Sequence, residues 1–80
     1  MLSLCNTTEN VLYRVTDISL DGAIKEKLMR LGLIEGTSVS RVLTAPSGDP
    51  SAYIIRGARI AIQNAHAERI TVTEVGESDE

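Results

Sequence analysis

The side chains that could do chemistry are few in this chain and lie far apart in the sequence. Among the most common nucleophiles and metal ligands, it contains one cysteine, Cys5, and one histidine, His66. A zinc or iron site needs several His, Cys or carboxylate ligands at suitable spacing. A reactive cysteine needs a neighbour that lowers its pKa. The sequence shows neither arrangement, so we expect no catalytic, cofactor-binding or metal-binding residue and predict that the chain is not an enzyme.

The two isolated groups have simpler interpretations. Cys5 lies in a polar stretch and is interpreted as an inert thiol, and His66 as a surface or capping residue in one helical turn over residues 64–68. A single cysteine cannot form an internal disulfide, which favours a reducing compartment. The first five residues lack a secretion signal, and no stretch approaches the ~20 apolar residues of a membrane span. We therefore predict a cytoplasmic protein without direct membrane insertion.

Length and composition indicate one small domain with an aliphatic core. The chain has 80 residues, 42% of them hydrophobic, but no Phe or Trp. Its formal net charge is −3 and its basic residues are scattered, whereas a nucleic-acid-binding domain usually carries a basic patch. We therefore predict no nucleic-acid partner. An RNA-binding barrel of the ribosomal kind remains an alternative, suggested only by Gly36 at the start of a predicted strand.

The nine residues from Leu28 to Gly36 connect a predicted helix to the strands that follow, and the rest of the chain is organised around them. Asp21 is a plausible helix N-cap, and an apolar stripe follows at helical spacing. Gly32 stands where a helix commonly ends in a left-handed residue. Gly36 then begins a strand. The apolar stripe consists of Ile24, Leu28 and Leu31.

The remaining segments have β character. Alternating or β-branched residues predict strands over 11–18, 37–45, 53–56, 59–62 and 70–75. The alternation in 37–45 is interrupted, which indicates a bulge. Turns are expected at Gly48, in the loop 45–50, and at Gly57, in a tight hairpin.

These elements predict a mainly β fold. About five short strands with one short helix inserted after the first are typical of a small SH3-like barrel, which hides strand edges by closure. We assign residues 1–10 to a loosely ordered entry segment, 11–75 to the barrel and 76–80 to a disordered acidic tail.

Four segments resemble, in order, the ferrous iron transport protein A family (FeoA). In residues 27–39, a basic residue and Leu28 precede Leu31-Gly32-Leu33, and Gly36 follows after two further residues. The segments 46–50, 56–62 and 67–72 resemble the family's Pro-x-Gly-Asp-Pro loop, glycine hairpin and closing strand. The family usually has a glycine within the stretch 8–10 and an arginine at the position of Gln63.

The resemblance implies a cytoplasmic accessory or regulatory protein of ferrous iron uptake. Its partner would be the membrane ferrous iron transporter with a cytoplasmic GTPase domain. Fe(II) as a bound metal is implied only by the association of the family with iron. Met29, which lies about 140° from the apolar stripe at ~100° per residue, is a partner-contact candidate together with Leu33 and Ile34. Core packing is the alternative for Leu33 and Ile34.

A second function stays open beside the first. Metal-dependent repressors carry a similar SH3-like domain at their C-terminus, so the resemblance also implies a free-standing metal-sensing module as an alternative. The sequence does not determine self-association.

Overall fold

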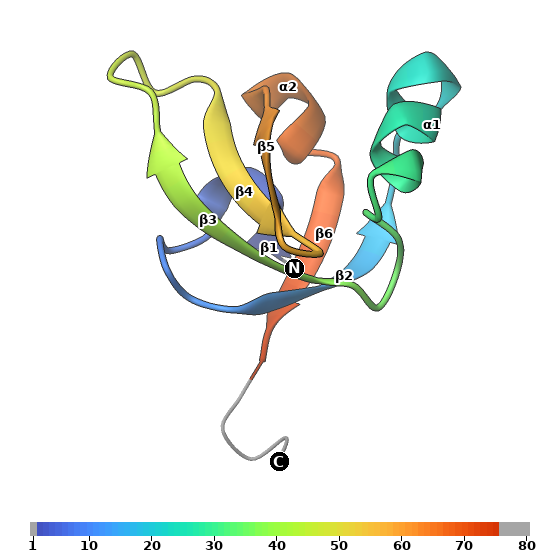
Figure 1. Ribbon diagram of the computed structural model, residues 1–80, viewed down its shortest axis with the longest axis horizontal. Coiled ribbons are helices and arrows are strands. Elements are labelled where there is room, and N and C mark those ends of the chain that lie inside the picture. Colours follow the sequence, from blue (N-terminus) through green and yellow to red (C-terminus); the bar gives the residue numbers. More distant parts are fainter. Residues whose placement is uncertain (1, 76–80) are drawn as a thin grey trace.

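The computed structural model describes residues 2–75, which form one curved antiparallel sheet and three short helical segments (Figure 1). The strands are β1 (Leu2–Ser3), β2 (Tyr13–Ile18), β3 (Ser38–Thr44), β4 (Ser51–Ile55), β5 (Ala58–Ile62) and β6 (Ile70–Glu74). The helical segments are the 3₁₀ turn η1 (Leu4–Asn6) and the α-helices α1 (Gly22–Arg30) and α2 (Asn64–Ala67).

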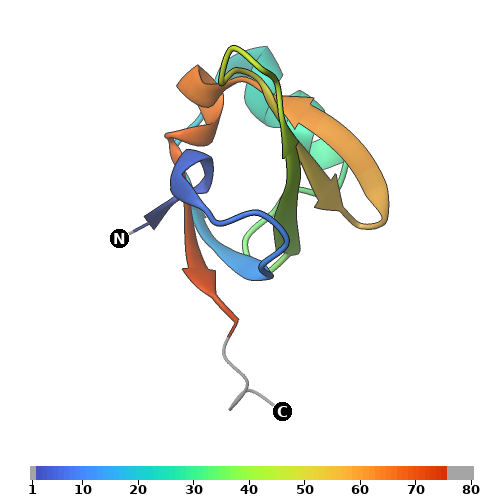
Figure 2. The ribbon, with the colours of Figure 1, turned by 90° about the vertical axis from the view of Figure 1, so that its left-hand side faces the viewer.

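The strands follow the order β1-β6-β2-β3-β4-β5 across the sheet. β1 and β5 therefore form its two edges, and the barrel is not closed by a ladder between them (Figure 2). The mainly β fold is confirmed. The helix α1 follows β2 rather than the first strand, because the short β1 precedes it in the described residues.

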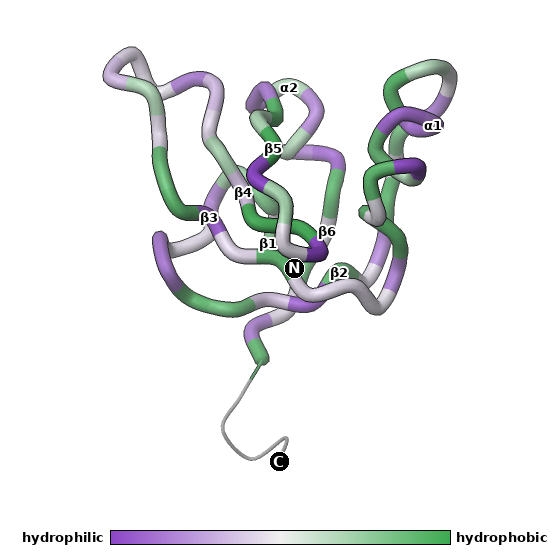
Figure 3. The backbone as a smooth tube through the Cα atoms, viewed as in Figure 1, coloured by the Kyte–Doolittle hydropathy of each residue, from purple (hydrophilic) through white to green (hydrophobic). Residues whose placement is uncertain are grey.

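The core is built from one face of each strand. The alternation predicted for the first long strand is confirmed from Tyr13 to Thr16, where Tyr13 and Val15 are buried while Arg14 and Thr16 are exposed. A register shift between Val15 and Asp17 interrupts it. Hydrophobic residues recur along the strands that line the inside of the curve (Figure 3). In the absence of Phe and Trp, Tyr53 is the largest fully buried side chain among the described residues.

Burial raises the pKa of the Tyr53 hydroxyl above its ordinary value of 10.0. Because the folded state then holds this proton more tightly than the unfolded state, the contribution to stability is present below pH 10 and is lost as the pH rises above it. We expect the melting temperature of the wild type to fall more steeply than that of Tyr53→Phe between pH 9 and 11. Equal slopes in a pH series of thermal melts would contradict this.

Residues 2–10 are an ordered part of the domain, so the prediction of a loosely ordered segment is wrong for them; Met1 lies outside the described residues. β1 pairs with β6, and Leu4 is fully buried. The Thr7 hydroxyl, also buried, donates a 2.8 Å hydrogen bond to the Leu4 carbonyl. Arg41 of β3 donates to the Thr7 carbonyl and lies 3.7 Å from the Glu9 carboxylate. The segment is held both by apolar burial and by this arginine.

Several local predictions can be compared with the backbone. A register shift between Arg41 and Leu43 confirms the bulge in β3. The hairpin between β4 and β5 turns on both Arg56 and Gly57, with φ of 50° and 82°, so Arg56 does not end the strand. Asn10 lies at φ 66° in the stretch where the FeoA family usually has glycine, and asparagine is among the residues that best tolerate this conformation.

Neither helix is capped by the side chain of its own N-cap residue. Asp21 is the N-cap residue of α1, as predicted, but its carboxylate makes no capping hydrogen bond. Gln63 is the N-cap residue of α2. The Asp49 carboxylate accepts a hydrogen bond from the Asn64 backbone N–H at 2.9 Å, and the Asn64 amide donates to the Gly48 carbonyl at 3.0 Å. The 45–50 loop thus caps α2 from outside. The predicted tail, 76–80, lies outside the described residues.

Candidate functional site

The end of α1 is fixed by a glycine-centred turn. Gly32 has φ 105°, and its N–H donates to the Met29 carbonyl at 3.0 Å. The Leu33 N–H donates to the Leu28 carbonyl at 2.9 Å. These two bonds define a Schellman motif, in which the residue after the left-handed glycine packs on the helix residue five positions before it. Leu33 and Leu28 are accordingly both buried, and the predicted role of Gly32 as the helix stop is confirmed.

The turn is then anchored to β2. The Gly36 N–H donates to the Val15 carbonyl at 2.7 Å, and the Val15 N–H donates to the Thr37 carbonyl at 2.9 Å. The Thr37 hydroxyl donates to the Gly32 carbonyl at 2.9 Å and accepts from the Ile34 N–H at 3.4 Å. Because so many of its backbone groups are bonded, the turn is a rigid platform for the side chains between Gly32 and Gly36.

An exposed apolar surface lies beside this turn, which we call the helix-end patch and define as Ile18, Met29 and Ile34. Met29 is 46% exposed and Ile34 39% exposed, and with Ile18 they line a cavity of about 320 Å³. Lys25 and Glu35 complete the lining. Lys25 and Met29 are four residues apart on α1 and therefore share a helix face.

The three partner-contact candidates separate into two groups. Leu33 is fully buried, so it belongs to the core, as the alternative interpretation held. Its burial follows from the Schellman motif. Met29 and Ile34 are exposed as a contact would require, and their role stays a prediction. Sequence reasoning missed Ile18 and Lys25. The i, i+4 spacing of Lys25 and Met29 was the one available signal for Lys25.

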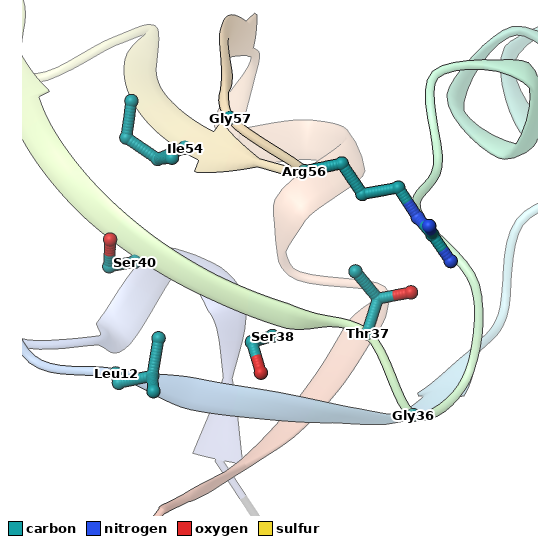
Figure 4. Close-up of a pocket in the computed structure, with 8 residues that line it drawn as sticks. All are labelled: Leu12, Gly36, Thr37, Ser38, Ser40, Ile54, Arg56 and Gly57. Atoms are coloured by element: carbon teal, nitrogen blue, oxygen red, sulfur yellow. The ribbon is translucent and has the colours of Figure 1, made fainter.

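On the other side of the turn, an open groove of about 450 Å³ crosses the sheet (Figure 4). It is lined by Leu12, Gly36, Thr37, Ser38, Ser40, Ile54, Arg56 and Gly57. The Arg56 side chain extends from the β4–β5 hairpin toward the turn between α1 and β3 (Figure 4). A Cβ on Gly32 would lie within 3.0 Å of Arg56 Cγ and Nε and closer still to Cδ. Gly32 therefore has a second role, because its lack of a side chain leaves the space that the Arg56 side chain occupies.

The other residues singled out for chemistry remain apart from this patch. Cys5 lies half-buried in η1, and His66 lies half-buried in α2. Within residues 2–75, no group of three or more His, Cys, Asp or Glu side chains is placed to hold a metal ion. In the same part of the chain, no helix is long and apolar enough to cross a membrane.

A curved antiparallel sheet of six strands, with α1 between β2 and β3, makes this a small SH3-like domain. The chain belongs to the FeoA domain family, which matches residues 2–74. This family is associated with ferrous iron transport, and its members are small accessory proteins that are not known as enzymes.

Three solved structures show the similarity. FeoA from Chlorobium tepidum is 28% identical with a TM-score of 0.88, covering 94% of this chain and 71% of that one. Iron(II) transport protein A from Clostridium thermocellum is 29% identical with a TM-score of 0.88, covering 94% of this chain but only 46% of that one.

The third is a zinc complex of FeoA from Stenotrophomonas maltophilia, described as a prokaryotic SH3 domain protein proposed to activate ferrous iron transport. It is 25% identical with a TM-score of 0.73, over 90% of this chain and 89% of that one. In a comparison with curated proteins, none matches this chain.

Proposed function

We propose that this chain is a cytoplasmic accessory protein of ferrous iron uptake that docks on the GTP-hydrolysing part of the membrane ferrous iron transporter. It acts by binding and not as an enzyme. Membership of the FeoA family supports the link to iron transport. The observation that carries the docking proposal is the helix-end patch, where Met29 and Ile34 are exposed on a hydrogen-bonded turn.

The chemistry of the patch suits a protein contact. The side chains of Met29 and Ile34 expose apolar surface to water. Burying that surface against a partner is favourable by about 25 cal/mol per Å². Methionine adapts its shape to a partner because its side chain is unbranched and flexible. Lys25 and Glu35 border the cavity with opposite charges, and such charged rims orient a partner more than they add affinity.

Met29→Glu should weaken binding to the purified cytoplasmic part of the transporter by about tenfold or more, because it places a charge in the centre of an apolar contact. The fold should be unaffected, since Met29 is exposed. Ile34→Glu should act in the same direction. Isothermal titration calorimetry with each variant measures the change.

Leu43→Glu is the matched control, because Leu43 is 55% exposed on β3 and does not line the patch. It introduces the same charge on an exposed apolar residue and should leave the affinity unchanged. If Met29→Glu and Leu43→Glu weaken binding equally, the effect is one of net charge, and the helix-end patch is not the contact surface.

A further inference from the structure

A second surface, separate from the helix-end patch, is formed by the free edge of β5. β5 ends the sheet and pairs only with β4 among the described strands. Exposed strand edges carry unpaired backbone groups that can pair with another extended segment. This edge is therefore a place where an additional strand could bind.

The hairpin register shows which backbone groups face outward. The two-residue turn brings Ile55 opposite Ala58, and the pairs Ile54–Arg59, Tyr53–Ile60 and Ala52–Ala61 follow. In an antiparallel ladder, hydrogen-bonded and non-hydrogen-bonded pairs alternate, and a two-residue hairpin turn closes on a bonded pair. Ala58 and Ile60 thus bond to β4, while the N–H and C=O groups of Arg59 and Ala61 face away from it. Within residues 2–75, neither of these two residues forms a backbone bond to an element other than β4.

A groove accompanies this edge. A cavity of about 320 Å³ runs beside the second half of β5, between this strand, α1 and α2. Ile24 and Leu28 of α1 line it, together with Ile60 and Ile62 of β5. An extended segment paired with Arg59 and Ala61 would place alternate side chains toward this apolar lining.

The charges along the edge favour an acidic occupant. Lys27 lines the groove, no Asp or Glu is among its lining residues, and Arg59 lies on the strand itself. This differs from the chain as a whole, whose net charge is −3. Asp49, next to the lining residue Pro50, is engaged by the Asn64 N–H. A second copy of β5 would bring Arg59 and Lys27 close to the same groups, and like charges disfavour such pairing.

We propose that the free edge of β5 binds an extended partner segment in which acidic and apolar residues alternate, as an added strand. The Arg59 and Ala61 backbone groups bond to the segment. Its apolar side chains enter the groove between Ile24 and Ile60, and its carboxylates, on the opposite face of the added strand, lie near Arg59. Strand addition of this kind draws affinity from main-chain bonds and specificity from alternating side-chain pockets. The proposal concerns a second contact and stands independently of the helix-end patch.

The test uses the whole chain, isotopically labelled, and a short blocked peptide in which aspartate and valine alternate. On titration, we expect amide shifts in NMR spectra confined to residues 58–63 and to the facing side of α1. With saturating peptide, amide exchange at Arg59 and Ala61 should slow by about tenfold, because these N–H groups become bonded. A peptide with lysine in place of aspartate should bind at least about threefold more weakly.

Two variants separate strand addition from simple charge attraction. Ala61→Pro removes an outward N–H that β4 does not use, and proline is tolerated at such edge positions. It should abolish slowed exchange and weaken binding, with the β-sheet spectrum retained. Should that variant misfold, a peptide methylated at alternate backbone nitrogens makes the same test with the unaltered chain. Met29→Glu should bind the peptide as the wild type does.

Three results would overturn the proposal. One is unchanged affinity for the methylated peptide or for the folded Ala61→Pro variant. Another is equal binding of the aspartate and lysine peptides. The third is concentration-dependent shifts at β5 without any peptide, which would assign this edge to a second copy of the chain.

Discussion

Leu4→Ala should destabilise the domain by about 2–5 kcal/mol, the range observed for truncating a buried leucine. Leu4 is fully buried in the core. It directly follows β1, and its carbonyl accepts the hydrogen bond from the Thr7 hydroxyl. A domain of this length has a total stability of roughly 4–12 kcal/mol, so the variant should be largely unfolded or close to it at 37 °C. Urea denaturation followed by circular dichroism measures the change.

Leu12→Ala is the matched control for Leu4→Ala. Leu12 is also a leucine near the N-terminus, but it is 48% exposed. Its replacement should cost less than about 1 kcal/mol, as is usual for surface positions. If Leu4→Ala were no more costly than Leu12→Ala, the N-terminal segment would not be part of the core.

Gly32→Ala should destabilise the domain by about 2–4 kcal/mol, for two reasons that add. A non-glycine residue at φ 105° is strained by about 1–3 kcal/mol. The new Cβ would also collide with the Arg56 side chain, which has to move. Thermal and urea denaturation of the variant test this.

Gly36→Ala separates the two causes. Gly36 has a similar φ of 92°, but a Cβ there would meet nothing within 4 Å. It should therefore show the backbone strain alone. Replacing Arg56 with alanine should rescue part of the loss in Gly32→Ala and none of the loss in Gly36→Ala. Equal losses for the two glycine variants, with no rescue, would show that the close approach of Arg56 has no energetic consequence.

The parts of the fold that follow from local rules could be predicted from the sequence. The apolar stripe and Gly32 locate α1 and its end, and the broken alternation of 37–45 locates the bulge at β3. The N-terminal segment could not be predicted in this way. Leu2 and Leu4 are two apolar residues in a run too short to predict a strand; Leu2 pairs with Val72 of β6, 70 residues later, and Leu4 is buried in the core.

The candidate site could likewise be predicted only where local geometry determines it. Helical geometry alone places Met29 outside the apolar stripe, and the structure shows it exposed. The burial of Leu33 follows from the Schellman motif, in which the residue after the glycine packs on the last turns of the helix. The position of the Arg56 side chain against Gly32 could not be predicted from the local sequence, because it depends on how the β4–β5 hairpin packs against the end of α1.

The most direct test of the docking proposal is capture of the transporter from cell membranes by the tagged chain, with and without a GTP analogue. We predict that the membrane ferrous iron transporter is retained by the wild type and lost with Met29→Glu but not with Leu43→Glu. We also expect the amount retained to depend on the nucleotide, which would place the contact near the GTPase. A folded wild-type chain that retains no transporter in either nucleotide state would contradict the proposal.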